Sequence, residues 1–240
     1  DLGQRMRLAL PNAFFFGLTG TPINKSDHNT FWTFGAQEDE HGYMSRYSFE
    51  DALRDKTILP LHFEPRLLDI HIDRDKVDEE FAAIANTLDE DAKITLSNKA
   101  AKMLEFLKSP ERIEIVCKDI AQHYQEKVEP QGFKAMIVTP DREACHLYKQ
   151  ELGKYFPDSA SAVVISTSGK GEDELKRLYN LSKDEQEKLI EKFNKPDSEL
   201  KFLIVTAKLL TGFDAPILQT MYLDKSLKDH TLLQAICRTN

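Results

Sequence analysis

The sequence predicts an α/β protein whose core is a parallel sheet with helices on both faces. From Gly132 onward, apolar runs of strand length alternate with amphipathic stretches of helical length, a pattern typical of a parallel, helix-covered sheet. Several of these runs end in a hydroxyl-bearing residue or a glycine, as expected where strands deliver polar groups to a ligand-binding edge. Residues 75–130 show helical periodicity instead, which predicts an α-helical insertion.

Short predicted elements and irregular polar chain make up the first sixty residues. Residues 2–10 predict a short helix, which Pro11 and the following asparagine end. Residues 13–18 form an apolar run that predicts a buried strand. The chain over 24–60 is polar and irregular, and a short helix is expected at 48–53.

An extended segment is predicted over residues 59–72, where apolar and polar residues alternate. Pro60 and Pro65 favour the edge of a sheet for this segment, because proline cannot donate to a central ladder. We place a domain boundary here, between residues 1–58 and 59–240.

Within the helical insertion, apolar stripes occupy residues 77–88 and 96–107. A third helix is expected to begin with Ser109 as N-cap and Pro110 at the first helical position. Acidic residues dominate the outer faces, which indicates a solvated surface.

The strands of the sheet are predicted from four apolar runs: residues 134–138, 162–165, 202–205 and 217–223. Thr139-Pro140 is expected to cap the helix after the first strand. Ser182 and Glu185 form a capping box that opens a helix before the third. Asp229 is expected to start the last helix.

Composition indicates a soluble, cytoplasmic protein. The 240 residues are 41% hydrophobic and 30% charged, and no apolar run approaches the roughly 20 residues of a membrane span. Three cysteines without a CxxC pair fit a reducing compartment. The chain has no initiator Met and no signal-peptide layout, so Asp1 is expected to be a cut inside a longer chain.

A net charge of −8 argues against a protein that coats nucleic acid. A protein that follows a phosphate backbone through one groove needs only a few local contacts, so an acidic surface elsewhere is compatible with it.

Hydroxyl groups follow three of the predicted strands, at Thr19 with Thr21, at Thr139 and at Thr206. Each can serve simply as the cap of the next helix. A helix N-terminus with a free hydroxyl is also a phosphate site, and the sequence leaves both roles open.

The spacing of the residues around Thr206 favours a functional role for this strand end. Thr206, Gly212 and Asp214 lie within nine residues, and Gln234 and Arg238 are spaced i,i+4, which predicts one shared face of the final helix. For Asp214 a turn role and for Arg238 a surface role remain the plain alternatives.

The ordered motifs resemble motifs III to VI of superfamily 2 helicases. The matching stretches are LTGTPI (18–23), MIVTPDREACHLY (136–148), VTAKLLTGFDAP (205–216) and QAICRTN (234–240). The resemblance is narrower still, to the motor (R) subunit of type I restriction enzymes. It rests on RMRLALPNAFFFG before motif III, on the segment YSFEDALRD after it, and on the TGFDAP form of motif V.

The resemblance implies a RecA-like fold of the P-loop NTPase type. Residues 1–58 would be the tail of the first helicase domain and its connection, and 59–240 the second domain, ending inside motif VI. The Walker A loop, the magnesium carboxylates and the nuclease domain are expected upstream of Asp1. Gly169-Lys170-Gly171 does not replace the Walker A loop, because it lacks the G-x4-G-K-[ST] frame.

Site roles are also implied by the resemblance. Arg238 would be an arginine finger and Gln234 its partner, which together are the expected catalytic residues. The residues expected to bind ATP or to couple its state to movement are Thr19, Gly20, Thr21, Gly212 and Asp214. Contacts to the DNA backbone are expected from Thr139, Arg142 and Thr206, and no metal ligand is expected in the chain.

As cofactors the resemblance implies ATP and Mg²⁺, held mainly by residues outside the chain. The implied partners are double-stranded DNA, the methyltransferase and specificity subunits, and the first RecA-like domain of the same protein, with no membrane. The chain alone is expected to be inactive. Two alternatives stay open: another superfamily 2 DNA helicase, and a non-catalytic RecA-like interaction module.

Overall fold

The computed structural model describes residues 2–20, 30–34, 39, 42–66, 103–167, 173–210, 213–227, 229–236 and 238–239. The chain forms two compact units. One contains residues 1–62, 227–238 and 240, and the other contains residues 63–226 and 239.

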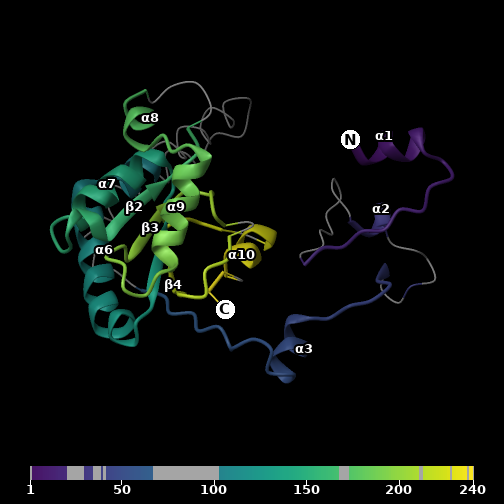
Figure 1. The fold of residues 1–240 in the computed structure, drawn as a ribbon, viewed down its shortest axis with the longest axis horizontal. Coiled ribbons are helices and arrows are strands. Elements are labelled where there is room, and N and C mark those ends of the chain that lie inside the picture. The colour runs from purple at the N-terminus through teal and green to yellow at the C-terminus, as the bar shows by residue number, and fades with distance from the viewer. Residues whose placement is uncertain are drawn as a thin grey trace, which may run out of the picture. The chain divides into compact units, whose positions relative to one another are not determined.

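The larger unit is built on a four-stranded sheet with the order β2-β3-β1-β4, in which every pair is parallel (Figure 1). The strands are β1 (Lys134–Val138), β2 (Ser161–Val164), β3 (Phe202–Val205) and β4 (Leu218–Leu223). This confirms the predicted fold class, and all four strands lie within one residue of the predicted ranges.

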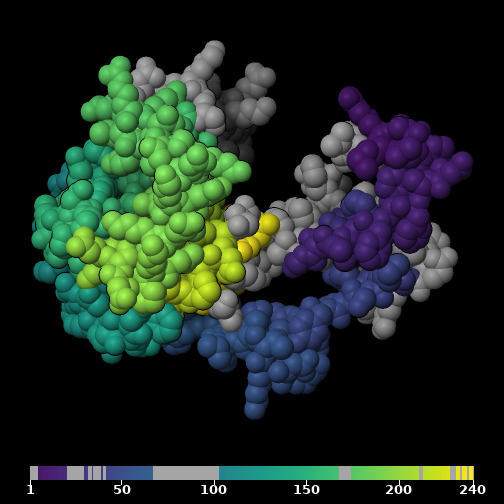
Figure 2. All heavy atoms as spheres, in the orientation of Figure 1, coloured from purple at the N-terminus to yellow at the C-terminus, as the bar shows by residue number. Residues whose placement is uncertain are grey.

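Helices cover both faces of this sheet: α6 (Pro110–His123) and α7 (Arg142–Leu152) on one side, and α9 (Lys183–Asn194) on the other (Figure 1). A shorter helix, α8 (Asp173–Tyr179), precedes α9. In the space-filling view α8 and α9, in green, form much of the face of this unit that is turned to the viewer (Figure 2).

Alternate residues of the buried strands face the two helical layers, because side chains on a strand point to opposite faces in turn. The core shared with α6 and α7 includes the strand residues Ala135, Ile137, Val163, Phe202 and Ile204. Their neighbours along the strands are also buried, which explains the continuous apolar runs in the sequence. Those neighbours are Met136, Val138, Val164, Leu203 and Val205.

The last helix of the predicted insertion belongs to this core. Ile113, Val116 and Ile120 of α6 are buried against the sheet residues. Ser109 is the N-cap and Pro110 is at the first position, as predicted, although the Ser109 side chain makes no capping bond. Thus α6 is a covering helix of the sheet, while residues 67–102 lie outside the described residues.

α6 does not end in a regular turn. It continues into one π-helical turn (Tyr124–Val128) and one 3₁₀ turn (Glu129–Gln131). Gly132 then takes a left-handed conformation with φ 77°, which glycine adopts without steric cost, and leads directly toward β1.

Two caps were predicted for the helices after β1 and β2. Ser182 forms the expected capping box with Glu185 at the start of α9. The prediction for α7 was wrong by two residues, because the side chain of Asp141, rather than that of Thr139, accepts the bond from the Ala144 amide at 2.8 Å.

The smaller unit contains the helices α1 (Leu2–Ala9), α2 (Thr30–Phe34), α3 (Phe49–Arg54) and α10 (Asp229–Ile236). Three were predicted, and α3 begins with a capping box from Ser48 to Asp51. The helix α2 was not predicted.

The predicted buried strand at residues 13–18 is wrong for this structure. The segment is irregular, and Phe14 and Leu18 are 82% and 86% exposed. A strand forms only where a neighbour completes its hydrogen-bond ladder, and no described strand pairs with this segment.

Candidate functional site

All four strands of the sheet end at the same edge, because they run parallel and in register. Val138, Val205 and Leu223 lie side by side at their carboxyl ends. The residues that follow are Thr139 after β1, Thr206 after β3 and Asp224 after β4. The sheet therefore brings the predicted strand-end residues Thr139 and Thr206 to one edge, where ligands of open α/β folds bind.

Thr139 lies inside this edge. Its side chain is fully buried, and its hydroxyl donates to the Asp141 carbonyl at 3.0 Å. The same hydroxyl is 3.0 Å from the Cys145 sulfur and 3.4 Å from the Val205 carbonyl. This placement does not support the prediction that the Thr139 side chain contacts DNA. It supports a role in shaping the turn between β1 and α7.

Arg142 begins α7 and is half-buried at the same edge. Its neighbours form an ion-pair cluster, in which the Lys108 ammonium lies 3.1 Å from the Asp141 carboxylate and 2.5 Å from that of Glu143. The bond to Glu143 is the main cause that raises the pKa of Lys108. The first turn of α7 is thus held to the start of α6.

The first part of the loop after β3, residues 206–210, is anchored to the sheet. Thr206 is half-buried, and Lys208 donates to the Ile165 carbonyl at the end of β2, at 3.5 Å. Leu209 takes a left-handed backbone with φ 69°, which is unusual for a bulky residue and clusters at functional sites. Its side chain and that of Leu210 are buried, which holds this conformation in place.

Asp214 presents its side chain to solvent between two buried neighbours, Phe213 and Ala215. Its predicted companion Gly212 lies outside the described residues, and so does Thr21.

A buried ion pair at this edge was missed by sequence reasoning. Arg112 of α6 binds both carboxylate oxygens of Asp224, directly after β4, and the Tyr148 hydroxyl of α7 donates to the same carboxylate at 2.5 Å. The available signal was an arginine on the inner stripe of a helix, between Ser109 and the buried Val116.

The remaining predicted residues belong to the smaller unit. Thr19 and Gly20 lie in exposed irregular chain, and Gln234 is half-buried on α10. α10 ends at Ile236, and the Arg238 amide donates to the Ala235 carbonyl in the turn that follows. Gln234 and Arg238 therefore do not share a helix face as predicted.

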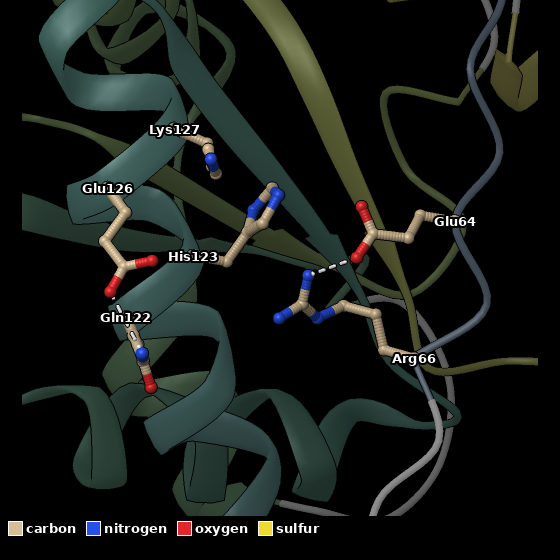
Figure 3. Close-up of a pocket in the computed structure, with 6 residues that line it drawn as sticks. All are labelled: Glu64, Arg66, Gln122, His123, Glu126 and Lys127. Carbon is tan, nitrogen blue, oxygen red and sulfur yellow. Dashed lines mark hydrogen bonds and ion pairs between the residues drawn. The ribbon is translucent and has the colours of Figure 1, made fainter.

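A groove of about 410 Å³ lies on the outer side of α6 and was not predicted. Figure 3 shows the residues that line it: Glu64, Arg66, Gln122, His123, Glu126 and Lys127. Arg66 is committed to Asp119 at 2.5 and 2.7 Å and to Glu64 at 2.7 Å. His123 shares a 2.8 Å bond with the Tyr222 hydroxyl, and burial lowers the pKa of His123. These bonds hold the side chains of Arg66 and His123 in fixed positions along the groove.

Two searches of the described residues concern metals and membranes. No group of three or more His, Cys, Asp or Glu side chains in this part of the chain could hold a metal ion. None of its helices is long and apolar enough to cross a membrane.

Two protein families match the chain. The SWI2/SNF2 ATPase family matches residues 1–94, and the family described as type I restriction enzyme subunit R domain 3 matches residues 167–240. The two matches lie in the order expected from the motifs.

Curated relatives match the whole chain. A Methanocaldococcus jannaschii protein named as a type I restriction enzyme endonuclease subunit is 35% identical over 100% of this chain and 23% of its own length. The type I restriction enzyme HindI endonuclease subunit of Haemophilus influenzae is 35% identical over 99% of this chain and 22% of its own length. The chain thus spans about a quarter of these relatives, and the resemblance predicted from the motifs is confirmed.

Among solved structures, the Sulfolobus solfataricus SWI2/SNF2 ATPase C-terminal domain is 14% identical, with a TM-score of 0.43. The match covers 68% of this chain and 77% of that domain. At this TM-score the likeness does not by itself establish a shared fold.

Proposed function

The chain is related over its whole length to the endonuclease subunits of type I restriction enzymes, and from this premise we propose that it is part of an ATP-driven DNA motor. In this proposal the parent subunit couples ATP hydrolysis to translocation of double-stranded DNA before cleavage. The observation that carries the proposal is the 35% identity along the full chain. The carboxyl edge of the sheet, where predicted site residues gather, supports it.

DNA would bind at that edge through its phosphates. Arg142 at the start of α7 and Thr206 with Lys208 after β3 offer a guanidinium, a hydroxyl and an ammonium at neighbouring strand ends. Such groups bind phosphate oxygens without reading bases, as a translocating protein requires. The net charge of −8 is compatible with this, because the contacts are local.

Roles at the nucleotide are proposed for seven residues of the chain. Arg238 would supply positive charge to the γ-phosphate, a contribution worth about 10³–10⁵ in rate for an arginine finger. Gln234 would orient Arg238 or a phosphate oxygen. Gly212 and Asp214 would link the nucleotide to the DNA-binding loop, while Thr19, Gly20 and Thr21 would couple the nucleotide state to domain movement.

The main ligands of ATP and Mg²⁺ would come from other parts of the parent subunit. The sequence lacks a G-x4-G-K-[ST] loop, so a different part of the parent subunit would cradle the phosphates. The metal would neutralise phosphate charge, and the residues of this chain would supply the arginine and the DNA contacts. The further partners in this proposal are the methyltransferase and specificity subunits, in the cytoplasm.

Arg238→Ala in the parent subunit tests the proposal. DNA-stimulated ATP hydrolysis is expected to fall by about 10³-fold or more, while DNA binding without nucleotide is retained. Arg177→Ala, on the exposed side of α8, is the matched control and should leave hydrolysis unchanged. An Arg238→Ala subunit with full DNA-stimulated activity would show that this chain takes no part in ATP hydrolysis, and would favour a non-catalytic module.

A further inference from the structure

We propose that Asp224, clamped by Arg112 and Tyr148, is a positioning residue for ATP hydrolysis. It would fix the carboxyl end of β4, the point from which the chain runs on to α10 and Arg238. This inference rests on the proposed motor function and names a residue that the motif comparison did not single out.

Three elements bind Asp224, two of them through its carboxylate and one through its backbone amide. Arg112 of α6 binds both of its oxygens, at 2.8 Å for the Nη1–Oδ2 bond, and Nη1 also donates to the Leu107 carbonyl at 3.1 Å. Tyr148 of α7 donates to Oδ2 at 2.5 Å. The Asp224 amide donates to the Val138 carbonyl at the end of β1, at 2.9 Å. The end of β4 is therefore bound to β1, α6 and α7 together.

Both charged partners of this clamp are largely withdrawn from water. The side chains of Arg112 and Asp224 are 10% and 14% exposed. The hydrogen bond from Arg112 to Asp224 is the main cause that raises the pKa of Arg112, and burial raises the pKa of Tyr148. Arg112 therefore stays charged and Tyr148 stays a hydrogen-bond donor at neutral pH.

Burial of this ion pair is hard to explain by stability alone. Well-packed apolar residues often stabilise a fold as well as a buried ion pair does, because desolvation offsets the Coulomb attraction. What the pair adds is geometry, since a two-pronged Arg–carboxylate bond fixes direction as well as distance.

Asp224 is connected to both groups of proposed site residues, to the DNA-binding group through its bond to β1 and to the ATP-binding group along the chain. Val138, to which Asp224 is bonded, precedes Thr139 and the start of α7 with Arg142. In the other direction Asp224 precedes Asp229, the first residue of α10, by five positions. A displacement of Asp224 would therefore move the end of β1 and the point from which the chain continues to Gln234 and Arg238.

The test is the double variant Arg112→Met/Asp224→Leu in the parent subunit, which removes both charges and leaves no buried charge unpaired. We expect a melting temperature close to that of the unmodified subunit. The kcat for DNA-stimulated ATP hydrolysis should fall by about tenfold to a hundredfold with little change in KM, as for misplaced catalytic groups.

The matched control is Lys201→Met/Glu129→Leu, which removes an ion pair at the opposite, amino edge of the sheet. It should leave kcat unchanged. If the double variant does not fold, the kcat of Arg112→Lys is measured instead. Lysine keeps the charge but cannot bind both oxygens of the Asp224 carboxylate. The kcat of this variant should fall several-fold at unchanged melting temperature.

The outcomes separate the two proposals. Loss of activity in Arg238→Ala together with full kcat in a folded Arg112→Met/Asp224→Leu subunit, or in Arg112→Lys if the double variant is unfolded, overturns the positioning role and leaves the motor function standing. Full activity in Arg238→Ala overturns both. An equal fall of kcat in the Lys201/Glu129 control also overturns the positioning role, because the effect would then be general.

Discussion

Cys145 shows how its surroundings suppress the chemistry of a reactive residue type. The thiol is fully buried behind β1, 3.0 Å from the Thr139 hydroxyl. Burial is the main cause that raises its pKa to about 12. Cys117 on α6 is also fully buried, and burial raises the pKa of its thiol as well. Both thiols are therefore protonated at neutral pH, and both act as small apolar core residues.

We predict that iodoacetamide will not modify Cys117 or Cys145 in the folded chain at pH 8, because the thiolate is the reacting form and both thiols are inaccessible. Peptide mass spectrometry after a timed reaction measures the modification at each cysteine. The same reaction in denaturant is the control and should label both. Labelling of either residue in the folded chain would mean that the core opens locally or that the thiol is ionised.

Thr139 shows what a motif cannot predict at this scale. The sequence places a hydroxyl at a strand end, where capping and phosphate binding are both reasonable. Cys145 is six residues further along and Val205 is sixty-six residues away, yet both enclose the hydroxyl. That the hydroxyl is enclosed in the turn between β1 and α7 follows only from the packing of β1 against β3 and α7.

The C-terminal end of α9 is capped by a side chain from the sheet. Lys134, the first residue of β1, is 3% exposed, and its ammonium donates to the carbonyls of Phe193 and Lys195 at 2.8 and 2.7 Å. These carbonyls lie at the C-terminal end of α9, where a cation also meets the negative end of the helix dipole. Burial nevertheless lowers the pKa of Lys134 to about 8.

The stability of the chain should therefore rise with pH between 8 and ~10.4, the ordinary lysine pKa. In that window the folded chain has lost the Lys134 proton while the unfolded chain still binds it, so raising the pH favours the folded state. The rise from this residue is at most about 3 kcal/mol. Urea unfolding at pH 7.5 and at pH 10 measures it.

Lys134→Met should abolish this rise, while Lys195→Met, at an exposed position, should keep it. Equal slopes of unfolding free energy against pH in the unmodified chain and in Lys134→Met would show that Lys134 has an ordinary pKa.

Strands could be predicted where the sheet buries both faces. Residues 135–138 and 202–205 are apolar because each residue faces a helical layer on one side or the other. The run at 13–18 has the same composition and is not a strand in this structure. An apolar composition indicates that a segment tends to be buried. A strand also needs a neighbouring strand, and the residues of the run itself do not show whether one is present.

For the site as a whole, the order of the sequence motifs predicted the carboxyl edge of the sheet but not the ion pair that stabilises it. Thr139 and Thr206 were predicted as strand-end residues, and parallel strands necessarily bring such residues to one edge. Arg112 and Asp224 are separated by 112 positions. No spacing rule connects them, since their contact depends on how α6 packs across β1 and β4.

At the scale of the whole molecule, the 240-residue chain is predicted not to hydrolyse ATP by itself. Its glycine-lysine stretch, Gly169-Lys170-Gly171, lacks the frame that cradles phosphates. Phosphoryl transfer depends on charges placed around the γ-phosphate from several directions. In the proposed motor, Arg238 would supply only one of these charges. Phosphate release by the purified chain, with and without double-stranded DNA, should equal the background rate.

Arg238→Ala in the same chain is the control for this experiment, because a contaminating ATPase would be unaffected by it. Residual release that is identical in the two samples agrees with the prediction. Release that DNA stimulates and that Arg238→Ala abolishes would contradict it. The chain would then hold a complete phosphate site of its own, and hydrolysis would not need residues from a further domain.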